Sequence, residues 1–232
     1  MLERVEIGKR IKENYEVRYK FKLLRRTPVI IRLDGNCFHT LTKDCKKPFD
    51  INISRTMEET ARYLCGEIQG ARCAYVQSDE ISILLTDFEQ LDTTAWFDYS
   101  IQKMTSISAG KASVFFTKYY GKDGIFDARV FNIPGEEVCN YFIWRQVDWE
   151  RNSLMMYALS LYPHEELQKK SKSSLHELIH RKGHNWATLE DRWKNGIFIE
   201  KGEDKWITSD RCPSFRTERD RIEKFICVKG EG

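Results

Sequence analysis

Residues 73–85, CAYVQSDEISILL, contain the clearest structural signal in the sequence. Two apolar runs rich in strand-forming residues, CAYVQ (73–77) and ISILL (81–85), are separated only by Ser78, Asp79 and Glu80. This spacing predicts a β-hairpin with a polar tip that carries two acids.

The segments around this hairpin alternate between strand and helix patterns. Residues 28–33 are apolar and β-branched, between a proline and an Asp-Gly pair, which predicts a strand. Apolar residues near helical spacing, closed by Gly70, predict a helix over 50–69. We also expect helices over 3–24, 96–119 and 135–161 and a strand over 126–133. The order β-α-β-β-α-β, with the helices on one face, is the ferredoxin-like split βαβ arrangement of an α+β fold.

The sequence changes character near residue 162, where short polar helices begin. GIFIE (196–200) and KWITS (205–209), joined through Gly202, predict a second hairpin. We therefore expect a catalytic domain over 1–162 and a smaller helical and hairpin region over 163–232 that packs on it.

Composition restricts the protein class. The 232 residues include 41% hydrophobic residues and carry a net charge of +3, as expected for a folded, soluble protein. The seven cysteines are scattered without a CxxC motif, which argues against a disulfide framework and a thiolate zinc site. With no signal-like apolar N-terminus and no apolar run of membrane length, a cytoplasmic location is expected. Residues 9–26 are strongly basic, which suits a solvated helix face and a nucleic-acid contact equally well.

Two acids lie at the ends of strands that are neighbours in the expected sheet. Asp34 follows strand 28–33 and Asp79 lies at the hairpin tip, so the two can meet at one edge. Two close carboxylates need a counter-charge, and hard oxygen ligands suit Mg²⁺ held together with substrate phosphates. Two such ions would serve phosphoryl or nucleotidyl transfer. The alternative is that Asp34-Gly35 is merely a turn and Asp79-Glu80 a solvated tip.

Several longer motifs occur in a specific order. RLDGNCFH (32–39), KPFD (47–50) and QSDEISILL (77–85) are followed by FDARVF (126–131) and WRQVDWERNS (144–153). Together they resemble the tRNA-His guanylyltransferase family, whose members add nucleotides to RNA in the 3′–5′ direction. The resemblance covers roughly residues 28–160, and GHNW (183–186) and KNG (194–196) extend it.

The resemblance implies a polymerase-like palm in which Asp34, the Gly35 carbonyl and Asp79 bind two Mg²⁺, with Glu80 as a further catalytic acid. It implies nucleotide-binding roles for Asn36, Cys37, Phe38, His39, Lys47, Asp50, Ser78, Lys103 and Arg129. For tRNA contacts we expect Arg145, Asn152, Lys169, Lys170, Lys172, Arg181 and Lys182. The implied partners are tRNA, ATP, GTP and other NTPs, in a homotetramer without membrane contact.

Two departures from the family pattern bear on the substrate. Glu150-Arg151-Asn152-Ser153 stands where tRNA-His-specific eukaryotic members carry a His-Ile-Asn-Asn type motif, and Ser100 replaces an extra arginine. The chain is therefore similar to the guanylyltransferase-like branch of bacteria, archaea and phages. That branch implies template-dependent repair of 5′-truncated tRNA after ATP or GTP activation of the 5′-phosphate; addition of the extra 5′ G to tRNA-His is the alternative.

A competing motif is HELIH (176–180), which has the HExxH pattern of zinc metalloproteases. Such a site needs a third protein ligand, and His184 follows Gly183, where the helix is expected to end. A basic surface helix near the tRNA is the preferred interpretation. A catalytically silent RNA-binding palm is a further alternative, against which the presence of Asp34, Asp79 and Glu80 argues.

Overall fold

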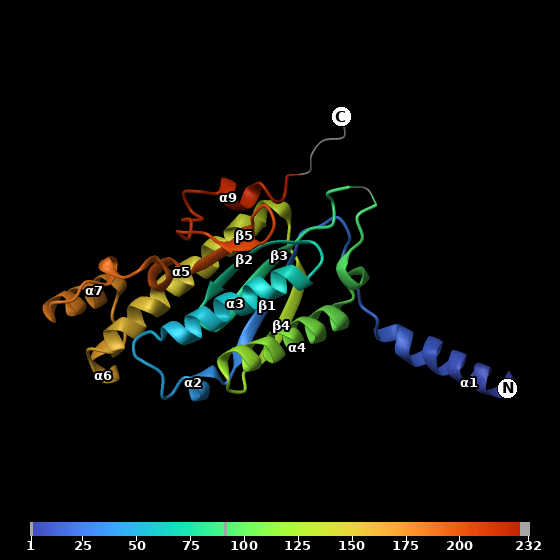
Figure 1. Ribbon diagram of the computed structural model, residues 1–232, viewed down its shortest axis with the longest axis horizontal. Coiled ribbons are helices and arrows are strands. Elements are labelled where there is room, and N and C mark those ends of the chain that lie inside the picture. Colours follow the sequence, from blue (N-terminus) through green and yellow to red (C-terminus); the bar gives the residue numbers. More distant parts are fainter. Residues whose placement is uncertain (1, 91, 228–232) are drawn as a thin grey trace.

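The computed structural model describes residues 2–90 and 92–227 and contains one six-stranded antiparallel sheet (Figure 1). Its strand order is β4-β1-β3-β2-β5-β6. The strands are β1 (Val29–Asn36), β2 (Ala71–Gln77), β3 (Glu80–Leu85), β4 (Ile125–Asn132), β5 (Ile197–Lys201) and β6 (Trp206–Thr208). The predicted hairpin of β2 and β3 forms, and β1 pairs with β3 along its length, so both predictions are confirmed.

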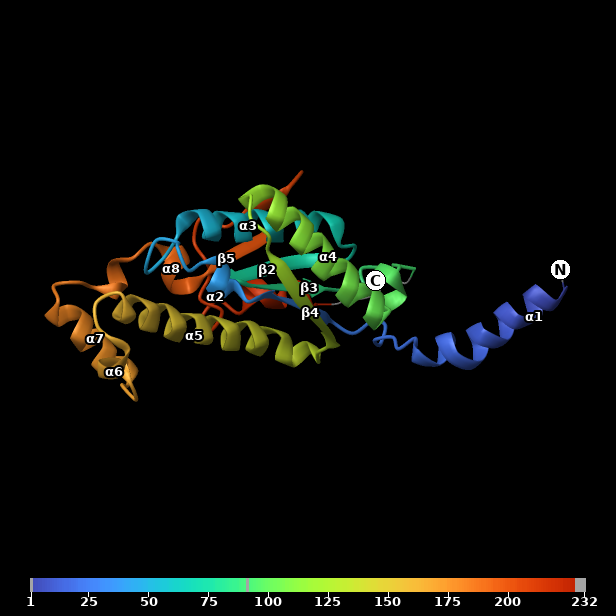
Figure 2. The same cartoon turned by 90° about the horizontal axis from the view of Figure 1, so that it is seen from below.

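Helices cover both faces of the sheet (Figure 2). Alternating residues of β1 divide between two cores, because successive side chains point to opposite faces. Val29, Ile31 and Leu33 face α3 (Ile51–Glu67) and α4 (Ile101–Tyr120). Ile30 instead lies in the core formed with α5 (Gly135–Leu159). The α+β prediction is confirmed, with both helices of the split βαβ unit on one face; α5 follows the unit and adds a layer on the other.

Local chemistry sets the limits of the helices. The Asp50 carboxylate caps α3 by accepting bonds from the Asn52 and Ile53 amides at 2.8 and 3.3 Å. The helix predicted over 96–119 begins only at Ile101. Phe97 and Asp98 before it are left-handed, both with φ of 51°, and Ser100 forms a β-bridge with Lys22.

The N-terminal segment projects from the sheet and its helices (Figures 1 and 2). The α-helix α1 spans only Leu2–Ile11, followed by a π-helical turn over 12–16, a 3₁₀ turn over 17–19 and non-helical chain. The prediction of one helix over 3–24 is wrong at its C-terminal end. Residues 6–22 are all exposed, so no packed face maintains a regular helix there.

The C-terminal region adds strands to the same sheet. β5 pairs with β2, with Ile197 opposite Val76, so the sheet crosses the boundary predicted near residue 162. The predicted hairpin forms as β5 and β6. The helices of this region are short: α6 (His164–Leu167), α7 (Lys172–Arg181), α8 (Asp191–Asn195) and α9 (Asp220–Glu223). No helix within 2–90 or 92–227 has the length and apolar character required to cross a membrane.

Candidate active site

The structure brings Asp34 and Asp79 to the same end of the sheet. Asp34 lies in β1 opposite Glu80 of β3, and Asp79 is the tip residue just before Glu80. The Gly35 amide donates to the Asp79 carbonyl at 3.0 Å, which ties the two segments together. Burial, and to a lesser degree the charge of Asp34, raise the pKa of the Asp79 carboxyl. The two acids therefore interact electrostatically, although they are distant in the sequence.

Strained backbone and an aromatic anchor fix the chain beside these acids. Cys37 and Ser78 are left-handed, with φ of 57° and 47°, which is unfavourable for side chains that carry a Cβ. Phe38 is buried against Phe116 and Phe126, with both ring-centroid distances at 5.1 Å. A Cβ at Gly35 would lie 2.5 Å from the Phe38 ring, so only glycine permits this close packing.

Glu80 is engaged elsewhere, in a buried ion pair with Arg145 of α5. The Arg145 Nε and Nη2 donate to the two Glu80 carboxylate oxygens, each at 2.7 Å. Burial raises the pKa of Glu80, and the Arg145 charge opposes that rise. Glu80 was predicted to be a catalytic acid beside the metals; the structure shows its two oxygens held by a structural partner.

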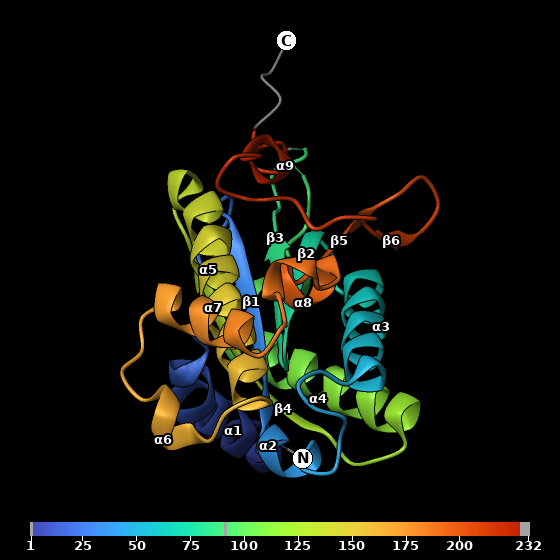
Figure 3. The ribbon, with the colours of Figure 1, turned by 90° about the vertical axis from the view of Figure 1, so that its left-hand side faces the viewer.

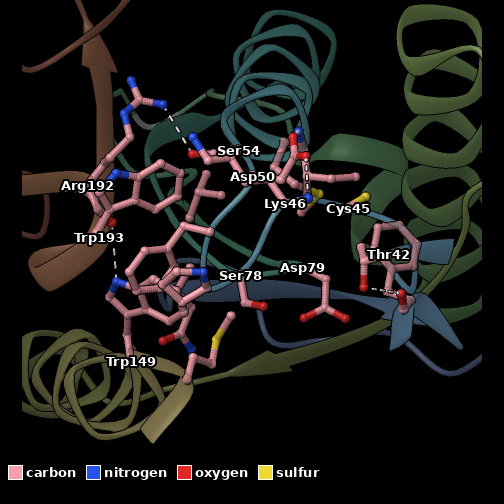
Figure 4. Close-up of a pocket in the computed structure, with 18 of the residues that line it drawn as sticks. Thr42, Cys45, Lys46, Asp50, Ser54, Ser78, Asp79, Trp149, Arg192 and Trp193 are labelled. Carbon is pink, nitrogen blue, oxygen red and sulfur yellow. Dashed lines mark hydrogen bonds between the residues drawn. The ribbon is translucent and has the colours of Figure 1, made fainter. Parts of the chain in front are cut away.

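A first cavity of about 270 Å³ opens between α3, the loop before it, the hairpin tip and α8 (Figure 4). Its inner wall is aromatic: Phe49 stacks on Trp193 with centroids 4.9 Å apart and an interplanar angle of 8°, and Trp149 lies beside them. Such a wall suits the flat face of a nucleobase.

Residues of the C-terminal region complete this cavity. Arg192 donates to the Ser54 hydroxyl at 3.1 Å and pairs with Glu58 of α3 at 3.2 Å. The Trp149 indole donates to the Arg192 carbonyl at 3.3 Å. The roles of Phe49, Trp193 and Arg192 were not predicted. The only signals in the sequence were the neighbouring family-like motifs KPFD and KNG.

A second cavity of about 450 Å³ adjoins the first on the side of α5. Gln77, Ser78, Asp79, Trp149 and Met156 line both cavities. Asp34 and Asn152 line only the second. Asp79 thus lies where two nucleotide-sized spaces meet.

The predicted nucleotide-binding residues other than Lys103 separate into three groups. Those lining the first cavity are Phe38, His39, Lys47, Asp50 and Ser78. Asn36 and Cys37 are exposed next to it, and the Cys37 thiol donates to the Asn36 Oδ1 at 3.2 Å. Arg129 is exposed on β4, opposite Arg32 of β1.

Lys103 is not brought to the site within one protomer. It lies at the start of α4, with its Nζ 5.7 Å from the Phe97 ring centroid. The other end of α4 reaches the site, where the Tyr120 hydroxyl lies 3.3 Å from the Cys45 sulfur. At 1.5 Å per residue, Lys103 is about 25 Å along the helix from Tyr120.

The predicted tRNA contacts also separate. Asn152 is exposed and lines the second cavity, whereas Arg145 is buried with Glu80. The remaining basic residues are exposed on and around α6 and α7, at the end of the molecule opposite α1 (Figure 1). They are Lys169, Lys170, Lys172, Arg181 and Lys182. Lys172 pairs with Glu150, and the Lys182 Nζ lies 5.1 Å from the Tyr162 ring centroid.

The HELIH segment (176–180) lies within α7. His176 packs on Trp186 with ring centroids 5.6 Å apart, and burial lowers its pKa. Within 2–90 and 92–227, no three His, Cys, Asp or Glu residues gather as metal ligands. The third ligand that the zinc-protease alternative requires is therefore not in place in that part of the chain.

Asp34 and Asp79 nevertheless fit a shared Mg²⁺ site. Their donors are hard carboxylate oxygens, and burial, with a smaller contribution from the Asp34 charge, raises the pKa of Asp79. Within residues 2–90 and 92–227, neither carboxylate forms an ion pair with a basic side chain. Mg²⁺ is usually bound through one or two protein carboxylates, with water and substrate phosphates as its other ligands.

Figure 3 shows the sheet from the perpendicular direction, with α5, α7 and α8 in front of β1, β2 and β3. A ferredoxin-like antiparallel sheet with two acids at one end, beside two adjoining cavities, suits a palm-type nucleotidyltransferase. Residues 8–134 match the family model described as tRNAHis guanylyltransferase. The chain therefore belongs to the tRNAHis guanylyltransferase family of nucleotidyltransferases.

Solved structures and one curated enzyme are similar to this chain. A bacterial tRNA(His) guanylyltransferase-like protein in complex with ATP has a TM-score of 0.92 and 38% identity, over 96% of this chain and 100% of that one. A bacterial protein of the same description in complex with GTP has a TM-score of 0.83 and 37% identity, over 95% and 99%. The tRNA(His) guanylyltransferase of Debaryomyces hansenii is 31% identical over 57% of this chain, and the match spans only 53% of that enzyme.

Proposed function

We propose that this chain is a 3′–5′ nucleotidyltransferase that repairs the 5′ ends of tRNA after activating them with ATP or GTP. The observation that carries the proposal is the place of Asp79, beside Asp34 and between two connected cavities. One reacting centre with a space on either side suits a reaction in which two nucleotide-bearing groups meet. The complexes of similar bacterial proteins with ATP and with GTP support a nucleotide in this site.

The proposed reaction has two displacements at phosphorus. An oxygen of the RNA 5′-monophosphate first attacks the α-phosphorus of ATP, forming a P–O–P bond and expelling pyrophosphate. The 3′-hydroxyl of an incoming NTP then attacks the 5′-phosphorus of the RNA, loses its proton to solvent, and expels AMP. The two steps need the same positioning and charge stabilisation, so one site can serve both.

Asp34, Asp79 and the Gly35 carbonyl would hold two Mg²⁺ ions. When bound, Mg²⁺ would lower the pKa of the attacking hydroxyl and stabilise negative charge on phosphate oxygens. The protein supplies the rest: Phe49, Trp149 and Trp193 hold the base, and the cation of Lys47 faces phosphate from the cavity wall.

The substrate choice is inferred from the segment Glu150-Arg151-Asn152-Ser153 in α5. Glu150 pairs with Lys172 of α7, and the Ser153 hydroxyl donates to the Trp193 carbonyl and accepts from the Trp186 indole at 3.0 Å. Asn152 alone is exposed towards the second cavity. This segment differs from the His-Ile-Asn-Asn type motif of the tRNA-His-specific members, which favours repair; G addition to tRNA-His is the alternative.

We further propose tRNA as the macromolecular substrate, a homotetramer as the assembly, and the cytoplasm as the location. The exposed basic residues around α6 and α7 support contact with a polyanion. Exposed apolar residues support contacts between subunits: Ile7, Ile11 and Tyr15 on the projecting segment, and Ile107 and Val114 on α4.

The decisive experiment supplies a labelled 5′-truncated tRNA, 5′-monophosphorylated, with ATP, NTPs and Mg²⁺. Product length is compared with that from full-length tRNA-His lacking only its extra 5′ G. Restoration of the truncated end at the higher rate is expected. A clear preference for the single G addition would overturn the repair proposal, and no addition to either RNA would overturn the reaction itself.

A further inference from the structure

An exposed tryptophan lies beside the paired acids, on the α5 face of the sheet. Trp144 is 53% exposed, an unusual position for the largest apolar side chain. The Arg145 guanidinium carbon lies 4.5 Å from its ring centroid, and the Tyr141 ring meets it edge-on at 5.9 Å. Because the Glu80 pair holds Arg145 rigidly, the indole is fixed from one side while much of its surface is open.

Two further arginines on this face oppose each other. Arg32 of β1 and Arg129 of β4 are directly paired across neighbouring strands, where like charges are destabilising. In the described chain, no carboxylate lies within 4.0 Å of Arg32, and its buried Nε has no hydrogen-bond partner. Among the residues that the structure describes, Arg129 forms an ion pair with Asp127 alone, at 4.0 Å, and both side chains are 56% exposed.

In the described chain the other acids of this face form no ion pair with the two arginines, although the Arg32 charge does act on Glu80 and opposes the rise of its pKa. Glu80 is bound by Arg145, and Asp148 accepts from the same guanidinium at 3.1 Å. Asp34 points to the same face as Arg32, about 7 Å further along β1, and is committed to the metal site under the proposed function. Arg32 and Arg129 thus form a cationic pair beside an aromatic surface, and the Arg32 guanidinium carbon lies 5.9 Å from the Trp144 centroid.

We propose that Trp144, Arg32 and Arg129 form a binding site for an unpaired nucleotide of the RNA substrate, next to its reacting 5′ end. The base stacks on the open face of the Trp144 indole, and the adjoining phosphate lies between the two arginines. This inference rests on the proposed function, because it assigns RNA as the occupant. A phosphate between the paired arginines relieves the repulsion between them, whereas an apolar protein partner would bury the two charges without neutralising them.

The test measures binding without catalysis. The probe is a short 5′-phosphorylated single-stranded RNA with 2-aminopurine near its 5′ end, titrated into the full chain and followed by fluorescence quenching and anisotropy. Trp144→Ala should weaken binding roughly ten-fold, within the range expected when base–aromatic stacking is lost, and should abolish quenching. Trp144→Phe should retain most of both effects. Arg32→Gln and Arg129→Gln should each reduce the salt dependence of binding.

Controls separate stacking from folding. Trp144→Leu keeps apolar bulk against Arg145 and should lose quenching with an unchanged Tm. Tyr119→Ala removes a comparably exposed aromatic side chain from α4 and should bind RNA like the unmodified chain. Wild-type binding and quenching in Trp144→Ala would overturn the site. If Trp144→Ala does not fold, the same result in Trp144→Leu would overturn it. RNA binding with Trp144-dependent quenching but no nucleotide addition would instead refute the proposed function alone.

Discussion

The Glu80 carboxylate and the Arg145 guanidinium form a buried bidentate ion pair, with both N–O distances at 2.7 Å. Only 10% of the Glu80 side chain and 9% of the Arg145 side chain are exposed. The pair joins β3 to α5 directly behind the paired acids. Both Glu80 oxygens are thereby engaged by Arg145, so under the proposed function Glu80 positions the site and Asp34 and Asp79 hold the metal ions.

Breaking this pair from one side should be costly. Arg145→Met leaves a buried carboxylate without its counter-charge and should destabilise the protein by about 3–5 kcal/mol. The double change Glu80→Gln with Arg145→Met removes both charges and should recover much of that loss. Urea unfolding of the three proteins measures the difference. Equal stability of the single and double variants would contradict a buried, coupled pair.

The Asp79 carboxylate should lower the stability of the folded chain while being required for activity. Its pKa is raised in the folded state by burial and by Asp34, so ionisation opposes folding and stability falls as pH rises through the raised pKa. Asp79→Asn should therefore raise Tm at neutral pH while abolishing nucleotide addition; 1 kcal/mol corresponds to roughly 2–4 °C in a domain of this size. If Asp79→Asn and the parent chain have the same Tm at every pH from 4 to 8, this account is contradicted.

The same pKa should control metal affinity. Mg²⁺ binds the ionised carboxylates, so its apparent affinity should fall as pH decreases through the raised pKa of Asp79, with proton release on binding. Calorimetric Mg²⁺ titrations in two buffers of different ionisation enthalpy measure that release. Asp34→Asn removes the charge that helps raise the pKa, so any residual binding should persist to lower pH. A pH-independent Mg²⁺ affinity between pH 4 and 7 would argue against the assignment.

Asp50 should affect stability through the start of α3. Burial would raise its pKa, but bonds from the Lys46, Asn52 and Ile53 amides outweigh that and lower it overall. Its contribution is therefore present above the unfolded pKa and lost as pH falls through the lowered folded pKa. Asp50→Ala should cost about 1 kcal/mol near neutral pH, and Asp50→Asn, which keeps an acceptor, clearly less. Thermal unfolding at pH 3–7 compares them; equal losses would exclude the cap as the cause.

Trp193 should contribute to nucleotide affinity through its stack with Phe49. Trp193→Ala removes one of the three aromatic residues of the wall and should raise the KM for ATP about ten-fold with a smaller effect on kcat, because its proposed part is to hold the base. Trp193→Phe, which keeps a stacking ring, is the matched control. Steady-state kinetics of the activation step provide the readout, and a loss confined to kcat would place Trp193 outside base binding.

The centre of the sheet was predictable because its signals are local. An apolar run, three polar residues and a second apolar run define β2 and β3, and the Asp-Gly pair marks the end of the apolar part of β1. The meeting of Asp34 and Asp79 then followed from the order of elements. The predicted N-terminal helix was too long because a charged helical pattern does not reveal whether the helix packs against a core. Residues 6–22 are all exposed and pack against no core.

Other parts of the site depend on long-range contacts. Lys103 was assigned to the nucleotide by resemblance, but α4 runs towards the site, so its first turn lies at the far end. The wall formed by Phe49 and Trp193 exists only because β5 pairs with β2 and carries α8 to the mouth of the cavity. Neither the spacing of residues in the sequence nor the composition predicts that β5 pairs with β2.

The late position of Trp193 in the chain has a consequence for biosynthesis. A ribosome delivers β1, β2, β3 and β4, with both acids, well before residues 192–197 emerge, yet the first cavity needs those last residues for its wall. A nascent or prematurely terminated polypeptide would carry Asp34 and Asp79 without a place for the base. Synthesis from N- to C-terminus therefore leaves the first cavity incomplete until residues 192–197 have left the ribosome.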